Sequence, residues 1–204
     1  MTRIKLCGLR RVCEVEWANE LRPDYVGFVL SPGYRRSVTP ETARVMKAAL
    51  SPSVRAVGVF TGEKPETVAR LLNDGLIDAA QLHAGEDEAY IARLHVLTDR
   101  PLIKAFRVRS ADDVRAAGRI HTDMVLLDSG TGTGKAFDWT LLAAANRPYI
   151  LAGGLDPERV GAATAALRPW GVDVSSGIET DGVKDRAKMA AFVTAVRGAD
   201  GESG

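Results

Sequence analysis

The chain has 204 residues, which suits one domain or two small ones and is ample for a sizeable core. Its 27 Lys and Arg residues nearly balance its 26 Asp and Glu residues, so the charge argues against a nucleic-acid face and against a membrane-surface patch. No apolar run approaches the roughly 20 residues that cross a bilayer.

Eight short runs rich in β-branched and apolar residues predict strands. In chain order these runs span 3–7, 24–30, 54–60, 78–83, 101–106, 123–128, 148–153 and 171–176. Between them lie stretches with apolar residues three and four positions apart, a spacing typical of amphipathic helices. The clearest stretches span 41–50, 65–75, 110–118, 156–167 and 184–196. Residues that favour helix N-termini precede several of them, such as Ser110 with Asp113, and Asp156 with Pro157.

The strict alternation of strands and helices predicts a parallel sheet. Two architectures compete, an open doubly wound sheet and a closed (β/α)8 barrel. The count of eight strands, with no linker or break in composition, favours the α/β class with a single-domain (β/α)8 barrel, also called a TIM barrel. We expect the barrel to span 1–198 and the polar segment 199–204 to form a flexible C-terminal tail.

The N-terminus and the two cysteines bear on the compartment. The first ten residues, MTRIKLCGLR, carry charges too closely spaced for a signal peptide. The cysteines, Cys7 and Cys13, form neither a CxxC pair nor a zinc-like array, so we expect no metal site. These features predict a cytoplasmic protein with reduced thiols.

The carboxyl ends of the predicted strands carry chemically capable side chains. In such a barrel, reactions occur at that rim and in the loops that follow it. Two glycine- or serine-rich loops, Gly153-Gly154 and Ser175-Ser176, follow strands seven and eight, where backbone N–H groups can approach an anion. Either loop alone could be an ordinary tight turn. Because both occupy the usual phosphate positions of this fold, we predict a phosphorylated small-molecule substrate.

The stretch VLLDSGTGTGKAFDW, at 125–139, begins as a strand and continues as a glycine-rich loop. A phosphate-binding P-loop would need Gly at 129 and Ser or Thr at 136, where the chain has Ser129 and Ala136. Asp128 is either a catalytic acid at the strand tip or a residue that caps the turn. We interpret 129–135 as a short lid over the site, anchored by Phe137 and Trp139.

Cys7 ends the first predicted strand. A cysteine on a barrel strand is usually a small buried apolar residue. Here the thiol precedes Gly8, and alternation places Lys5 on the same face, where a cation favours the thiolate that can accept a proton. Cys13 falls in the first predicted helix, and we interpret it as a packing residue.

Several segments resemble the signature sequences of one enzyme family. They are KLCGL at 5–9, GFVLSPGYRRSV at 27–38, GVF at 58–60, QLH at 81–83, LLDSGTGTGKAFDW at 126–139, LAGGLDPERV at 151–160 and GVDVSSGIETDGVKD at 171–185. Together they are similar to phosphoribosylanthranilate isomerases, the (β/α)8 enzymes of tryptophan biosynthesis. The similarity runs in order from residue 3 to about residue 196.

This resemblance implies an Amadori rearrangement of N-(5-phosphoribosyl)anthranilate, without cofactor or metal. It implies Cys7 as general base and Asp128 as general acid. Substrate-binding roles follow by the same resemblance for Lys5, Arg36, His83 and Asp173. The phosphate would be bound by Gly153, Gly154, Ser175 and Ser176. The implied partner is a small phosphorylated anthranilate, with no nucleic acid and no membrane, and the chain would be a monomer or a homodimer.

The sequence also departs from the family pattern. Ala84 stands where the family usually has glycine, and the segment after Asp128 is shorter, with Thr131 in place of the first glycine of a Gly-Gly pair. Three alternatives stay open. Indole-glycerol-phosphate synthase uses a lysine acid and a glutamate base, and no such glutamate ends a strand here. A histidine-pathway isomerase would pair two aspartates, against which Cys7 argues. The third is a non-catalytic phosphometabolite-binding barrel.

Overall fold

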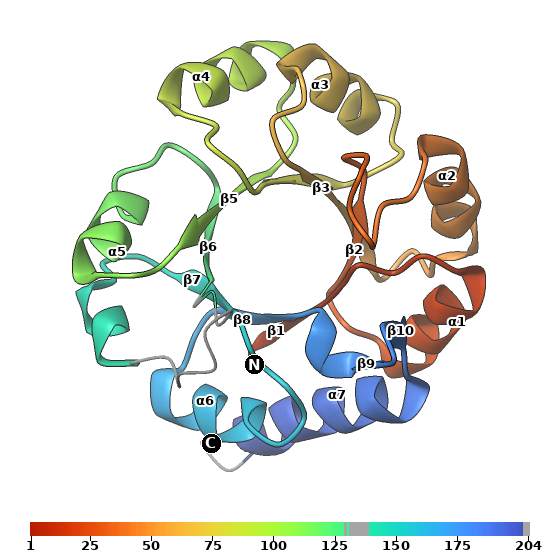
Figure 1. Cartoon of the computed structure of the whole chain (residues 1–204), viewed down its shortest axis with the longest axis vertical. Helices are drawn as coiled ribbons and strands as arrows, with labels where there is room; N and C mark the ends of the chain where they lie inside the picture. The colour runs from red at the N-terminus through yellow and green to blue at the C-terminus, as the bar shows by residue number, and fades with distance from the viewer. Residues whose placement is uncertain (129, 131–138, 202–204) are drawn as a thin grey trace.

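The computed structural model describes residues 1–128, 130 and 139–201. Its centre is a closed barrel of eight parallel strands in sequence order, with β8 pairing back to β1 (Figure 1). The strands are β1 Arg3–Cys7, β2 Tyr25–Val29, β3 Arg55–Phe60, β4 Ala79–Leu82, β5 Leu102–Arg107, β6 Met124–Asp128, β7 Tyr149–Ala152 and β8 Gly171–Val174. The predicted (β/α)8 barrel is therefore confirmed, and the open doubly wound sheet is excluded.

Helices surround the barrel and cover its outer face (Figure 1). They are α1 Val12–Leu21, α2 Pro40–Ala49, α3 Pro65–Asn73, α4 Glu88–Leu97, α5 Ala111–Ala117, α6 Val160–Leu167 and α7 Arg186–Gly201. Between β6 and β7 the described residues form a 3-10 helix, η1 Trp139–Ala144. The sequence pattern predicts that this helix begins at Asp138, a residue that lies outside the described part of the chain.

Local sequence explains most helix starts. Ser110 and Asp113 form a reciprocal capping box at α5, and Thr39 caps α2 ahead of Pro40 at the first helical position. The stretch predicted to begin at Asp156 is helical only from Val160. The Asp156 carboxylate instead accepts backbone N–H bonds in a preceding turn, from residues 158 and 159.

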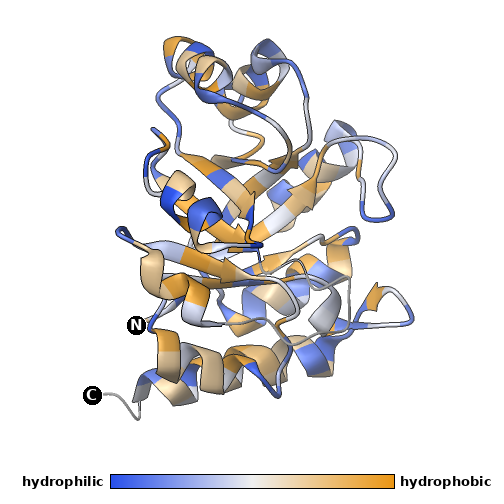
Figure 2. Ribbon diagram, turned by 60° about the vertical axis from the view of Figure 1, so that its left-hand side comes forward, coloured by the Kyte–Doolittle hydropathy of each residue, from blue (hydrophilic) through white to orange (hydrophobic). Residues whose placement is uncertain are grey.

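The core has two parts. The larger cluster lies between the strands and the helices, and a smaller one fills the barrel interior with side chains such as Val57, Ile103 and Leu126. Apolar residues accordingly dominate the strands, and hydrophilic residues gather in the loops (Figure 2). Because successive strand side chains point to opposite faces, each strand presents one set of residues inward, up to the rim.

A two-stranded antiparallel hairpin follows β8 and was not predicted. It pairs β9 Glu179–Thr180 with β10 Val183–Lys184 after a short 3-10 helix, η2 Ser176–Ile178. Its turn places Asp181 and Gly182 at positive φ, 50° and 78°. A turn of this kind favours glycine at one or both positions.

The C-terminal prediction is wrong for residues 199–201. α7 runs through Gly201, Ala199 is buried, and the Asp200 carboxylate accepts bonds from both the backbone N–H and the hydroxyl of Thr2, at 2.7–3.0 Å. Contacts with the other end of the chain thus order a segment whose composition looks like a tail. Residues 202–204 lie outside the described part of the chain.

We expect Asp200→Ala to destabilise the fold by about 1–3 kcal/mol, because two donors of buried Thr2 lose their acceptor. Urea unfolding followed by circular dichroism measures the change. Asp112→Ala is the control, since that aspartate is 87% exposed and should change stability by less than about 0.5 kcal/mol. Equal stability of both variants would mean that the last turn of α7 is not part of the cooperative fold.

Candidate active site

A cavity of about 580 Å³ opens at the carboxyl ends of the strands. It brings together every candidate site residue from the sequence except Lys5: Cys7, Arg36, His83, Asp128, Gly153, Gly154, Asp173, Ser175 and Ser176. Val29, Val59, Gln81 and Ala152 also line it. A concave site with an apolar wall and a few convergent polar groups is typical of small-molecule binding.

Lys5 lies beside Cys7 and is 1% exposed. Register places Lys5 opposite Asp173 on β8, and its ammonium donates to the Asp173 carboxylate over 2.8 Å. Burial lowers the pKa of Lys5, but Asp173 and Cys7 outweigh burial, and the net pKa is raised. Lys5 is therefore a fixed cation beside Cys7 and Asp173, which both line the cavity.

The Cys7 side chain is buried, with 7% of the residue exposed. Burial raises the pKa of the thiol, the Lys5 ammonium opposes this, and the net pKa is raised. Lys5 thus lowers the pKa of Cys7, as the sequence predicts, but burial raises this pKa by more. Gly27 on β2 makes room for both groups, since a Cβ there would lie 2.7 Å from Cys7 Sγ and 3.2 Å from Lys5 Nζ. Cys13 lies on α1 and is partly buried.

Asp128 ends β6, which β7 and β8 separate from β1 around the barrel (Figure 1). One carboxylate oxygen accepts the Gly130 N–H at 2.8 Å, and the other lies 3.7 Å from His83 Nε2. The second ring nitrogen of His83, Nδ1, lies 3.0 Å from Gln81 Nε2. An amide nitrogen only donates, so Nδ1 accepts and the proton of a neutral His83 ring faces Asp128.

Gln81 is a site residue that the sequence did not single out. It lies two positions beyond Ala79, on the inward face of β4, and is 1% exposed. Its amide oxygen is buried without a hydrogen-bond partner in the described part of the chain. The signals that could have indicated it are its place in the QLH segment at 81–83 and its position two residues before His83.

We expect His83 to populate the Nε2–H tautomer when neutral, because the Gln81 amide donates to Nδ1. Long-range ¹H–¹⁵N spectra measure this directly, and the chain has only three histidines to assign. Gln81→Met should weaken the preference, while His95 and His121 serve as internal references. A dominant Nδ1–H tautomer in the wild type would mean that the amide oxygen of Gln81 faces the ring.

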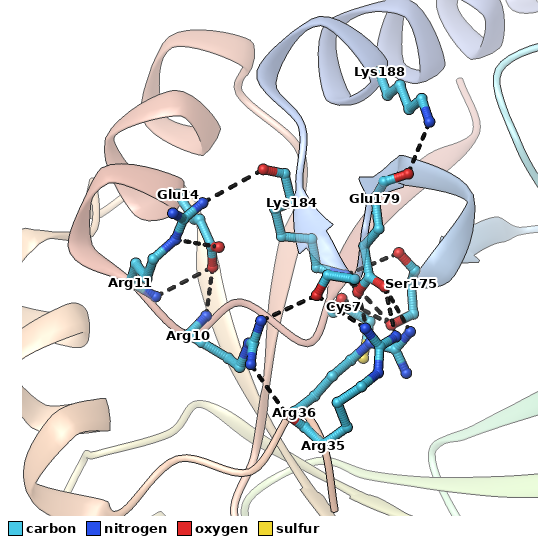
Figure 3. A network of polar contacts seen from close by, with 11 residues as sticks. Cys7, Arg10, Arg11, Glu14, Arg35, Arg36, Ser175, Glu179, Lys184 and Lys188 are labelled. Atoms are coloured by element: carbon cyan, nitrogen blue, oxygen red, sulfur yellow. Dashed lines mark hydrogen bonds and ion pairs between the residues drawn. The ribbon is translucent and has the colours of Figure 1, made fainter.

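Arg36 reaches the cavity from the loop after β2, and Glu179 on β9 holds it. The guanidinium donates through Nε and Nη2 to the two Glu179 oxygens, at 2.6 and 2.9 Å (Figure 3). The hydrogen bonds to Glu179 raise the pKa of Arg36, so it stays cationic. The sequence identified Arg36 but not Glu179, which lies in a hairpin that local patterning does not predict.

The loops after β7 and β8 lie close together. Gly153 and Gly154 have φ of 89° and 63°, which L side chains rarely adopt. A Cβ at Gly177 would lie 2.0 Å from the carbonyl oxygen of Leu155, so only glycine allows this approach. The Ser175 hydroxyl donates to the Cys7 carbonyl over 3.2 Å, which ties the second loop to β1.

Some expectations are not addressed by the described residues. The interpreted lid at 129–135 lies outside them apart from Gly130, and so does Phe137. Within the described ranges, no cluster of His, Cys, Asp and Glu could hold a metal ion. In the same ranges, no helix has the length and apolar character to span a membrane.

Comparison with known proteins identifies the family. The model for N-(5'-phosphoribosyl)anthranilate (PRA) isomerase matches residues 4–195. The chain belongs to this family. A PRA isomerase of Acetivibrio thermocellus is 42% identical over 215 residues, covering 98% of both proteins. The resemblance seen in the sequence is confirmed.

Solved PRA isomerase structures share the architecture. That from Thermotoga maritima superposes with a TM-score of 0.87 at 34% identity, covering 97% of this chain and all of that one. Another, in complex with reduced 1-(o-carboxyphenylamino)-1-deoxyribulose 5-phosphate, has a TM-score of 0.85 at 33% identity over the same shares. The fold of this family therefore extends over nearly the whole chain.

Proposed function

We propose that the chain catalyses the Amadori rearrangement of N-(5'-phosphoribosyl)anthranilate to 1-(2-carboxyphenylamino)-1-deoxy-D-ribulose 5-phosphate, a step of tryptophan biosynthesis. One observation carries the proposal: Cys7 and Asp128 line the same cavity in a barrel of this family. Curated relatives bear the isomerase name, and one related structure holds a reduced form of the product. The proposed mechanism needs only proton transfers, for which side chains suffice without a cofactor.

Asp128 acts first, as the general acid. Its proton passes to the ring oxygen of the ribose, which opens the ring and leaves a protonated Schiff base. The carboxylate that results lies at the rim, where the Gly130 N–H donates to one oxygen and His83 faces the other. These two groups orient the acid toward the cavity.

Cys7 acts second, as the general base. The protonated Schiff base acidifies the hydrogen on the sugar C2, which the thiolate removes to give an enolamine. The enolamine then tautomerises to the ketose product. The Lys5 ammonium stabilises the thiolate, and Asp173 holds Lys5 in place at 2.8 Å.

The remaining groups bind the two ends of the substrate. Arg36 receives the anthranilate carboxylate, because a guanidinium recognises carboxylates through paired N–H donors. The backbone of Gly153, Gly154, Ser175 and Ser176 binds the phosphate, as expected for this rim of a barrel.

Turnover of N-(5'-phosphoribosyl)anthranilate tests the function, followed by the loss of its fluorescence. We expect loss at a rate proportional to enzyme concentration. A histidine-pathway aminoaldose substrate should not be converted at a comparable rate. Absence of turnover, with phosphate binding retained, would favour the non-catalytic phosphometabolite-binding barrel.

Two broader assignments accompany this function. We place the chain in the cytoplasm, where its substrate pathway operates. For assembly, we propose a monomer or a homodimer; the relative from Thermotoga maritima is described as dimeric. Sedimentation velocity at several concentrations distinguishes the two states.

A further inference from the structure

Three cationic side chains bind the carboxylate of Glu179 near the cavity (Figure 3). Its carboxylate binds Arg36, Arg35 at 2.7 Å and Lys184 at 2.8 Å, and its side chain is only 5% exposed. Burial raises the pKa of this carboxyl, but hydrogen bonds from Arg36, Lys184 and Arg35 exceed that effect and hold the pKa well below its usual range. Glu179 is therefore an anion near neutral pH.

Arg36 reaches Glu179 by a confined route. Its aliphatic stem crosses Gly8, the residue after Cys7, where a Cβ would lie 2.5 Å from Arg36 Cδ. The bidentate pair with Glu179 fixes the plane of the guanidinium and uses Nε and Nη2. Arg36 lines the cavity, whereas Glu179 is not among the described residues that do so. The two N–H groups of Nη1 and the second N–H of Nη2 are thus the edge of Arg36 left to meet a ligand carboxylate.

Lys184 connects the Glu179 carboxylate to Ser175, in the loop after β8 that is proposed to bind the phosphate. It is buried, and its ammonium donates to Glu179 and to the Ser175 carbonyl, each at 2.8 Å (Figure 3). The Ser175 hydroxyl in turn bonds the Cys7 carbonyl. One carboxylate therefore holds both Arg36 and the segment that carries Ser175 and Ser176.

The net charge of the group formed by Glu179, Arg35, Arg36 and Lys184 is informative. Three cations around one carboxylate leave a surplus of two positive charges beside the cavity. Without the carboxylate these cations would repel one another, and Arg36 could swing away from Gly8. The surplus itself suits a ligand that carries both a carboxylate and a phosphate.

We propose that Glu179 is a positioning residue, which sets Arg36 for the substrate carboxylate and, through Lys184, sets Ser175 for the phosphate. The inference rests on the proposed function for the identity of the ligand. It adds that the spacing between the two anion-binding points is fixed by the β9–β10 hairpin. Substrate length is then selected by a residue that does not touch the substrate.

Glu179→Gln tests this, since the amide keeps the shape but removes the charge. We expect KM to rise by about 10- to 100-fold and kcat to change by less than about threefold, because positioning affects binding of substrate and transition state alike. Inorganic phosphate and anthranilate are each tested as competitive inhibitors, and the inhibition constants of both should be higher for Glu179→Gln than for the wild type. The control is Lys188→Met, whose ammonium donates to the Glu179 backbone oxygen and not to its carboxylate, and which should leave KM unchanged.

A double-mutant cycle separates positioning from general damage to the fold. The quantity compared is the change in log KM for the substrate that Glu179→Gln causes. In an Arg36→Met background this change should be less than half of the change that Glu179→Gln causes in the wild type. Full additivity, or an unchanged KM in Glu179→Gln, would overturn the proposal. Should Glu179→Gln fold poorly, Glu179→Asp keeps the charge at a shorter reach, and its KM should lie above that of the wild type.

The two proposals can fail separately. If the wild type does not turn over N-(5'-phosphoribosyl)anthranilate, the proposed function fails. Calorimetric titration of inorganic phosphate and of anthranilate still compares the wild type with Glu179→Gln. Equal affinities of the two proteins for both compounds would refute the positioning role by itself.

Discussion

Cys7→Ser is expected to lower kcat by about 10²–10⁴-fold, since a serine hydroxyl is a far weaker base than a thiolate near neutral pH. Substrate affinity should stay within a few-fold, because Arg36 and the phosphate loops are untouched. Steady-state kinetics on N-(5'-phosphoribosyl)anthranilate measure both quantities. Cys13→Ser, on α1, is the matched control and should leave turnover nearly unchanged.

The pH profile gives a second readout for Cys7. Burial raises the thiol pKa, so the thiolate is the minor form below that pKa and its share grows as pH rises. The thiolate share of Cys7, followed by its ultraviolet absorbance in a Cys13→Ser background, should therefore increase with pH up to the raised pKa. Lys5→Met, which removes the opposing cation, should move this rise to higher pH. Wild-type-like turnover in Cys7→Ser would remove the thiolate from the mechanism.

Asp128→Asn is expected to lower kcat by about 10²–10⁴-fold, because an amide keeps the shape of the carboxyl but does not supply a carboxylic proton. Binding should be largely kept, since the cavity wall is unchanged. Single-turnover measurements isolate the chemical step from product release. Turnover within a factor of ten of the parent would place the acid elsewhere and leave Asp128 as a turn residue that accepts the Gly130 N–H.

His83→Ala is the comparison for Asp128. His83 faces one carboxylate oxygen at 3.7 Å, so its loss should reduce kcat less than the loss of the acid itself. A reduction as large as that of Asp128→Asn would mean that the ring takes part directly in the proton transfer.

Much of the candidate site was predictable because of one property of the fold. The carboxyl ends of parallel strands meet at one rim, so residues that end predicted strands must lie near one another. That reasoning located Cys7, His83 and Asp128 correctly around one cavity.

The sequence by itself determined the barrel. Local hydrophobic periodicity and helix caps, such as Ser110 with Asp113, specify the alternation of strands and helices. Tertiary structure alone decided what each side chain meets. Lys5 binds Asp173 from 168 positions away, and Arg36 binds Glu179 from 143 positions away. Burial in the closed barrel raises the pKa of Cys7, although the Lys5 ammonium lowers it. This burial follows from the whole surrounding fold and not from the residues next to Cys7 in sequence.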